Sequence, residues 1–192
     1  MKRLIVASTN AGKIREVSLA LSDLPEWNVE SVPDLPDIEE NGATFLENAT
    51  LKAAHYSRFI SDLTLADDSG LCVTALDGRP GIHSARYSAS ANERNDRLLS
   101  ELAALGPETD RSAAFYCAFV VAHNGTVLWS VQTELRGQIA DGPSGDFGFG
   151  YDPIFLVPEQ GQTLAQMMTD EKNQVSARGK ALHQLRDFLA SR

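Results

Sequence analysis

The dipeptide Asn124-Gly125 separates two apolar runs, Ala113 to Ala122 and Val127 to Leu135. Asn-Gly is the strongest short-range signal for a two-residue turn between antiparallel strands, because both residues tolerate the positive φ that such a turn requires. The two runs therefore predict a β-hairpin in the second half of the chain.

Strand-like and helix-like segments alternate before this hairpin. Two capping boxes, Thr44 with Glu47 and Ser90 with Glu93, mark the starts of two helices. The expected strands are Arg3 to Ala7, Trp27 to Val32, Leu63 to Ala66, Leu71 to Leu76 and, after the hairpin, Ile154 to Val157. Four helices are expected. The first carries Ile14, Val17 and Leu21, and the second runs from Thr44 to about Ser61. The third begins at Ser90, and the fourth carries Val175, Leu182, Leu185 and Leu189. Alternation followed by a hairpin indicates an α/β fold with a mixed sheet flanked by helices.

Size and charge limit the classes of partner. The 192 residues predict one domain, 1–192. A formal net charge of −9 argues against binding to polymeric nucleic acid, but it leaves room for a small polyanion held by a local basic cluster and a divalent cation. The longest apolar stretch is shorter than the ~18 residues that span a bilayer, so no membrane segment is expected. Free thiols at Cys72 and Cys117 suit a reducing compartment, and the expected location is the cytoplasm.

The segment "STNAGK", Ser8 to Lys13, lies at a predicted strand-to-helix turn. Free backbone N–H groups and the helix dipole favour an anion at such a turn. The segment is not a Walker A loop, since Ala7 and Ile14 replace the required glycine and hydroxyl residue. It predicts a phosphate site, although an ordinary helix start capped by Ser or Asn has the same pattern.

Carboxylates form a second cluster, with Glu39 and Glu40 in one loop and Asp67 and Asp68 after a predicted strand. Adjacent acids at the end of a buried strand need solvent or a cation, and carboxylate oxygens suit Mg²⁺. The alternative for Glu39 and Glu40 is solvated surface.

Two further segments could bind the rest of a nucleotide. In "GFGYDP", Phe149 and Tyr151 could stack on a planar ring, although tight packing is the simpler interpretation. In "EKNQVSARGK", Lys172, Arg178 and Lys180 surround the expected start of the last helix, where surface charge is the alternative. No Gly-x-Ser-x-Gly elbow or Cys-His arrangement is present, so hydrolysis would use activated water.

Six motifs in this order resemble the Ham1 family of inosine triphosphate pyrophosphatases. They are "ASTNAGKIREV", "ENGATFLENATLKA", "ADDSGL", "PGIHSARYS", "FGFGYDPIF" and "EKNQVSARGKAL". The resemblance implies hydrolysis of deaminated purine nucleoside triphosphates (ITP, dITP and XTP) to a monophosphate and pyrophosphate, which cleanses the nucleotide pool. It also implies an elongated mixed sheet, two lobes around a central cleft, and a homodimer.

The resemblance also assigns roles to individual residues. Asp68 would be the general base, and Glu40 and Asp68 would bind Mg²⁺. The substrate would contact Ser8, Thr9, Asn10, Ala11, Gly12, Lys13, Ser69, Phe149, Gly150, Tyr151, Asp152, Lys172, Ala177 and Arg178.

One position departs from the family pattern. The family usually has Ser-His-Arg where this chain has Ser176, Ala177 and Arg178, so a contact to the base is missing. Two alternatives remain open: a related pyrophosphatase that acts on pyrimidine or modified triphosphates, as in the Maf family, and a nucleotide sensor without turnover.

Overall fold

The computed structural model describes residues 1–31 and 38–192. Val32, which the predicted second strand included, and residues 33–37 lie outside the described residues. The strands are β1 (Lys2–Val6), β2 (Trp27–Ser31), β3 (Leu63–Val73), β4 (Ser112–His123), β5 (Thr126–Ile139), β6 (Phe155–Val157) and β7 (Gln162–Thr163). The α-helices are α1 (Ala11–Ala20), α2 (Phe45–Tyr56), α3 (Ala91–Ala104), α4 (Thr169–Val175) and α5 (Ala177–Ala190), and the short 3-10 helices are η1 (Thr74–Leu76), η2 (Gly81–Arg86), η3 (Asp152–Ile154) and η4 (Leu164–Gln166).

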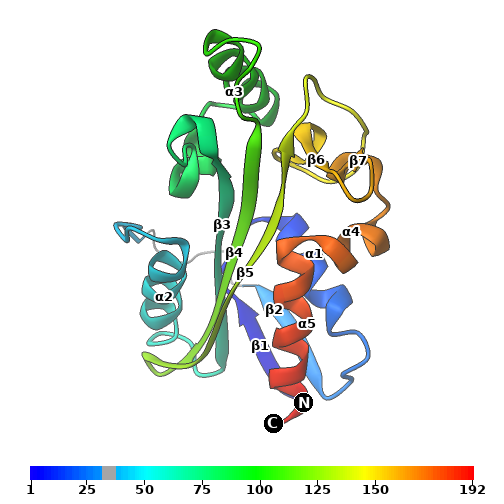
Figure 1. Ribbon diagram of the computed structural model, residues 1–192. Helices are drawn as coiled ribbons and strands as arrows, with labels where there is room; N and C mark the ends of the chain where they lie inside the picture. The colour runs from blue at the N-terminus through cyan, green and yellow to red at the C-terminus, as the bar shows by residue number, and fades with distance from the viewer. Residues whose placement is uncertain (32–37) are drawn as a thin grey trace. The chain divides into compact units, whose positions relative to one another are not determined.

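The described strands form one mixed sheet in the order β2-β1-β3-β4-β5-β6-β7. β1 pairs in parallel with β2 and β3, while β6 pairs antiparallel with β5 and β7. The hairpin is confirmed: β4 and β5 meet at Asn124 and Gly125, whose φ angles are 50° and 78°. The long strands β3, β4 and β5 can be followed in Figure 1, and the α/β class with a mixed sheet is confirmed.

The chain divides into two compact units. Unit 1 comprises Met1–Asp68, Cys117–Thr133 and Lys180–Arg192, and unit 2 comprises Ser69–Tyr116 and Glu134–Gly179. β3, β4 and β5 each contribute residues to both units. The single domain and the central cleft stay predictions.

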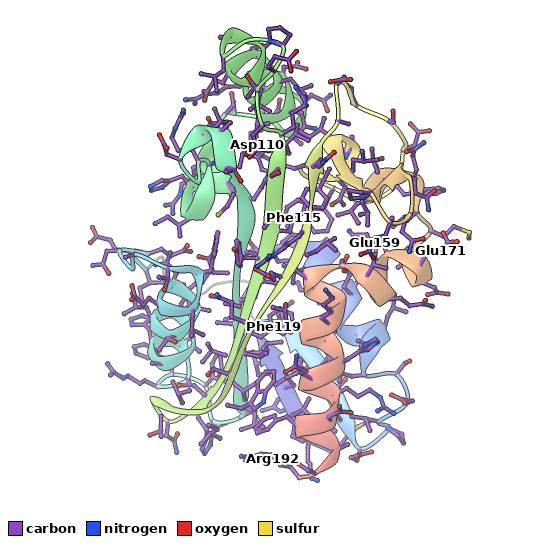
Figure 2. All side chains as sticks on the ribbon, viewed as in Figure 1. Asp110, Phe115, Phe119, Glu159, Glu171 and Arg192 are labelled. Atoms are coloured by element: carbon purple, nitrogen blue, oxygen red, sulfur yellow. The ribbon has the colours of Figure 1, made fainter. Side chains whose placement is uncertain are left out.

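Each unit has its own apolar core. In unit 1 the fully buried side chains include Leu4, Leu65, Phe119, Leu182 and Leu185. The two chain ends lie side by side in this unit (Figure 1), where the Lys2 ammonium donates to the carbonyl oxygen of Arg192. In unit 2 the fully buried side chains include Leu71, Leu98, Leu102, Ile154, Phe155 and Met167. Phe115, labelled on β4 in Figure 2, packs on Phe155 with ring centroids 4.7 Å apart.

Several predicted boundaries are wrong: among them, the strand expected over Leu71 to Leu76 ends at Val73, and Thr74–Leu76 form η1. Asp67 to Gly70 lie inside the continuous strand β3 rather than after a short strand. The helix that begins after Thr44 ends at Tyr56, because Arg58 and Phe59 donate to the carbonyls three residues earlier and tighten the chain into turns. The last helix is two helices, separated at Ser176, whose extended backbone (φ −64°, ψ 153°) interrupts the helical bonds.

No helix among residues 1–31 and 38–192 has the length and apolar character needed to cross a membrane.

Candidate active site

The "STNAGK" segment forms the turn from β1 into α1, as predicted. Asn10 caps the helix: its side-chain oxygen accepts hydrogen bonds from the N–H groups of Gly12 (2.9 Å) and Lys13 (3.2 Å). Ser8 in turn accepts a hydrogen bond from the Asn10 N–H at 3.1 Å. The turn is thus held in shape by its own side chains, and Thr9 and Ala11 are exposed on it.

Asp67 and Lys13 form an ion pair in unit 1. The Lys13 ammonium lies 2.7 Å from the Asp67 carboxylate, whose side chain is 6% exposed. Consecutive residues of a strand point to opposite faces, so Asp67 and Asp68 meet different partners. The pairing explains how an acid can lie inside β3, since Lys13 supplies the compensating charge.

Asp68 is buried and lies among groups from α2 and the preceding loop. It accepts a hydrogen bond from the Asn48 side-chain amide at 3.1 Å. Burial raises the pKa of the Asp68 carboxyl above its ordinary value. The positive charge of Lys52 opposes that rise in pKa, and the negative charge of Glu40 adds to it. Asp68 is therefore a desolvated carboxylate with a second acid close by.

Glu40 and Asp68 fit a divalent cation by their donor chemistry. Mg²⁺ prefers oxygen ligands and is commonly held by one or two carboxylates together with substrate phosphates and water. The Glu40 carboxylate also lies 3.3 Å from the Lys52 ammonium. Within the part of the chain that the structure describes, no group of three or more His, Cys, Asp and Glu residues could hold a metal. Two carboxylates would suit a cation that shares its ligands with a phosphate.

The loop before η3 gathers an aromatic ring, a cation and an anion in unit 2. The Asp152 carboxylate accepts hydrogen bonds from the Phe149 N–H (2.8 Å) and the Lys172 ammonium (2.9 Å). The same ammonium lies 4.7 Å from the centre of the Phe149 ring. Gly148 has a φ of +76°, and a Cβ there would collide with the Asp152 carboxylate. Glycine is therefore required for the loop to close on Asp152.

The two aromatic side chains of this loop differ in exposure. Phe149 is 43% exposed, whereas Tyr151 is 4% exposed. The Tyr151 hydroxyl donates to the carbonyl oxygen of Ser84 at 2.9 Å, and burial raises the pKa of its phenol. Of the two rings, Phe149 is the one with surface to offer a base.

Ser84 gives the "PGIHSARYS" motif a structural role. Its hydroxyl accepts a hydrogen bond from the Leu71 N–H (2.9 Å) and donates to the Gly81 carbonyl (2.6 Å). Because its carbonyl also holds Tyr151, η2 connects β3 to the aromatic loop.

Arg178 and Ala177 begin α5, after the break at Ser176. The Ser176 hydroxyl accepts a hydrogen bond from the Gly179 N–H at 3.0 Å. The Arg178 guanidinium donates to the Ser69 hydroxyl at 3.1 Å, so these two predicted site residues lie together. Ala177 is buried, with 3% of its surface exposed.

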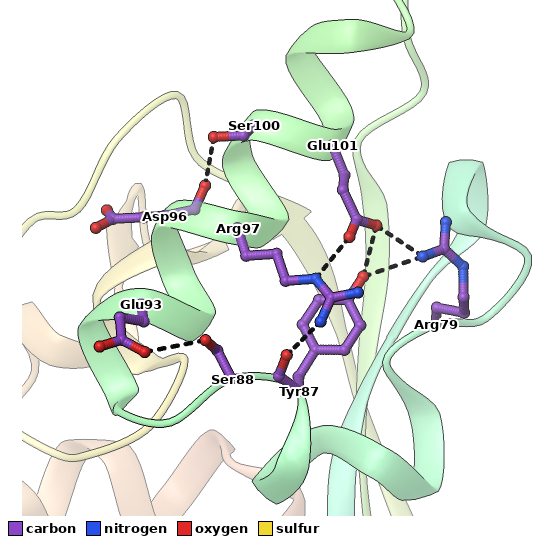
Figure 3. A network of polar contacts seen from close by, with 8 residues as sticks. All are labelled: Arg79, Tyr87, Ser88, Glu93, Asp96, Arg97, Ser100 and Glu101. Atoms are coloured by element: carbon purple, nitrogen blue, oxygen red, sulfur yellow. Dashed lines mark hydrogen bonds and ion pairs between the residues drawn. The ribbon is translucent and has the colours of Figure 1, made fainter.

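A polar network holds α3 in unit 2. Figure 3 shows Arg79, Tyr87 and Arg97 converging on the carboxylate of Glu101, at 2.7, 2.6 and 2.8 Å respectively. Burial opposes the ionisation of this carboxyl, but the three hydrogen bonds outweigh burial and hold its pKa below the ordinary value. The anchored helix carries Asn95, whose amide donates to the Gly150 carbonyl at 3.2 Å.

Sequence reasoning missed Asn48, Lys52 and Asn95. Asn48 and Lys52 are four residues apart on α2 and so share a face of the helix, beside the apolar stripe of Ala49 and Ala53. The available signal was the helical spacing of Asn48 and Lys52, which places two polar side chains next to the buried apolar stripe of α2. Nothing in the local pattern marked Asn95, because its partner Gly150 is 55 residues away in the chain.

Comparisons with known proteins agree with the motifs. The Ham1 family model matches residues 4–188. A protein of Geobacter sulfurreducens named dITP/XTP pyrophosphatase is 47% identical, over 98% of this chain and 97% of its own length. The solved structure of a HAM1 protein from Coxiella burnetii is 40% identical, covers 100% of both chains and has a TM-score of 0.90. That of a nucleoside-triphosphatase / dITP/XTP pyrophosphatase from Mycobacterium abscessus is 36% identical, covers 97% of this chain and 99% of its own, and has a TM-score of 0.75. The chain therefore belongs to the Ham1 family.

Proposed function

We propose that this chain hydrolyses the deaminated purine nucleoside triphosphates ITP, dITP and XTP to a monophosphate and pyrophosphate, with Mg²⁺ as its metal. Family membership and the name of the 47% identical relative support this substrate class. The observation in this chain that carries the proposal is the buried Asp68 beside Glu40. A desolvated carboxylate with a raised pKa accepts a proton more readily than an exposed one, as a general base must.

Asp68, Lys13 and Glu40 would act on the triphosphate. Asp68 would take a proton from the attacking water. Lys13 and the N-terminus of α1 would hold the β- and γ-phosphates as one leaving group, with Lys13 exchanging part of its contact with Asp67 for phosphate oxygens. Glu40 and Asp68 would hold Mg²⁺, which offsets the charge of the pyrophosphate when it is bound.

Phe149 and Arg178 would receive the nucleoside. Phe149 offers its exposed ring to the base, and the Asp152–Lys172 pair sets the position of the loop that carries it. Arg178 and the backbone N–H groups near it would donate to the 6-keto oxygen, beside Ser69. An amino group in ATP would leave such donors unpaired, which is the basis of discrimination against ATP.

A panel of nucleoside triphosphates with Mg²⁺, assayed separately for pyrophosphate and orthophosphate, tests the proposal. We expect stoichiometric pyrophosphate from ITP, dITP and XTP, and little turnover of ATP. Preference for dTTP over dITP would favour a pyrophosphatase of pyrimidine nucleotides instead. Saturable dITP binding without release of pyrophosphate would favour a sensor, and release of orthophosphate would contradict the single-step mechanism.

We further propose a cytoplasmic homodimer that cleanses the nucleotide pool. Light scattering after size exclusion measures the oligomeric state, and a mass of one chain would contradict the dimer.

A further inference from the structure

The Asn48 side chain uses both ends of its amide in the interior of unit 1. It is 0% exposed. Its oxygen accepts a hydrogen bond from the Gly42 N–H at 2.8 Å, and its nitrogen donates to the Asp68 carboxylate at 3.1 Å. A short amide carries one acceptor and one donor group, so Asn can satisfy both partners at once.

The two partners of Asn48 belong to the two segments that carry the carboxylate pair. Gly42 is two residues after Glu40, and Asp68 lies on β3. The Gly42 loop is pressed against α2: a Cβ on Gly42 would lie 2.7 Å from the Asn48 oxygen and 2.8 Å from the Cβ of Glu47. One turn further along α2, Lys52 contacts Glu40 itself at 3.3 Å. α2 therefore helps to set the positions of the Glu40 and Asp68 carboxylates.

We propose that Asn48 is a positioning residue that fixes Glu40 and Asp68 as a ligand pair for a divalent cation. The inference rests on the magnesium site of the proposed function. Groups that hydrogen-bond to metal ligands fix their orientation, and losing such a group typically weakens metal binding or activity about 10- to 100-fold. Asn48 would do so for Asp68 directly and for Glu40 through the backbone of its loop.

Mn²⁺ binding to the full chain without nucleotide, followed by electron paramagnetic resonance of the free ion, tests the inference. Asn48→Ala removes both hydrogen bonds, and Asn48→Leu removes them while keeping the number of side-chain heavy atoms and the branching at Cγ. We expect each to weaken Mn²⁺ binding by about 10- to 100-fold. The Mg²⁺ concentration for half-maximal dITP hydrolysis should rise in parallel, with KM for dITP at saturating Mg²⁺ changing less.

Two further variants separate positioning from stability. Gly42→Ala displaces the loop that carries Glu40 but leaves Asn48 itself unmutated. It should therefore also weaken Mn²⁺ binding. Ala53→Gly lowers the stability of the same helix by removing a buried methyl group and helix propensity, without touching a polar contact, so it should leave Mn²⁺ affinity unchanged.

The outcomes distinguish the inference from the proposed function. Mn²⁺ affinity within twofold of the wild type in both Asn48 variants and in Gly42→Ala would overturn the positioning role, even if thermal stability fell. An equal loss of affinity in Ala53→Gly would overturn it too, because destabilisation of α2 would then be a sufficient cause. A wild-type chain that binds no Mn²⁺ and hydrolyses no dITP would overturn the magnesium site itself.

Discussion

Replacing Asp152 by Asn should destabilise unit 2 and weaken substrate binding together. The Asp152–Lys172 pair is almost fully buried, with side-chain exposures of 7% and 11%. Asparagine keeps the size of the side chain and an oxygen that can accept the Phe149 N–H, but it removes the negative charge. Lys172 then keeps its charge in the interior without this counter-ion.

The magnitude follows from the geometry of the pair. Unit charges 2.9 Å apart attract by about 6 kcal/mol at an effective dielectric constant of about 20. Relief of the desolvation of the carboxylate offsets part of this loss, and removing one partner of a buried pair usually costs about 3 to 5 kcal/mol. Because the Phe149 ring and the new amide oxygen still contact the ammonium, we expect about 3 kcal/mol. At about 2 to 4 °C per kcal/mol for a chain of this size, Tm should fall by about 6 to 12 °C.

Urea unfolding and differential scanning calorimetry measure this loss, and steady-state kinetics on dITP measure its effect on function. Asp141→Asn is the matched control: it removes one carboxylate from the same unit, but that side chain is 100% exposed. Its free energy of unfolding should stay close to that of the wild type. The double variant Asp152→Asn with Lys172→Gln should recover part of the lost stability, because the buried charge of Lys172 is removed together with its Asp152 counter-ion.

Two results would refute this reasoning. The first is an Asp152→Asn variant as stable as Asp141→Asn, which would mean that the pair contributes no net attraction. The second is a double variant whose loss equals the sum of the two single losses, which would mean that Asp152 and Lys172 act independently.

Three other substitutions test separate parts of the site. Asp68→Asn should lower kcat by at least about 10²-fold, and near-normal turnover would assign the base elsewhere. Burial raises the pKa of the Asp68 carboxyl, so the stability that this carboxyl contributes is complete below its ordinary pKa of about 3.8 and is lost as pH rises through its pKa in the folded state. In chelator-treated protein, Asp68→Asn should therefore gain stability relative to the wild type as pH rises from 4 to 8. Ala177→His should raise the ratio of kcat/KM for ITP over ATP by up to about tenfold, the value of one neutral hydrogen bond, whereas an unchanged ratio would place selectivity at Phe149. Tyr151→Phe removes the bond to Ser84 and should cost about 1 kcal/mol in urea unfolding; an unchanged midpoint would show that this bond does not hold the loop.

Short sequence motifs correctly predicted the elements that neighbouring residues determine. Asn124-Gly125 marks its hairpin because these residues adopt positive φ, and Ser90 marks the start of α3 because its hydroxyl caps the Glu93 N–H at 3.2 Å. The errors arose where distant contacts decide. Two carboxylates suggested the end of a strand at Asp67, yet β3 continues through them because Lys13, far away in sequence, compensates the charge of Asp67.

By itself, the sequence determined the mixed α/β class, the family and the residue types available for the chemistry, because periodicity, turn residues and motifs are properties of neighbouring positions. Only the tertiary structure decided which of those residues meet. Asp67 forms an ion pair with Lys13, and Asp68 accepts a hydrogen bond from Asn48. Lys172 contacts Asp152 and the Phe149 ring. Tyr151 is buried, whereas Phe149 is exposed. Which side chains meet depends on burial and on charges brought together from distant positions in the sequence. Burying a charge without a partner is costly, and this cost favours the arrangements in which buried charges are paired.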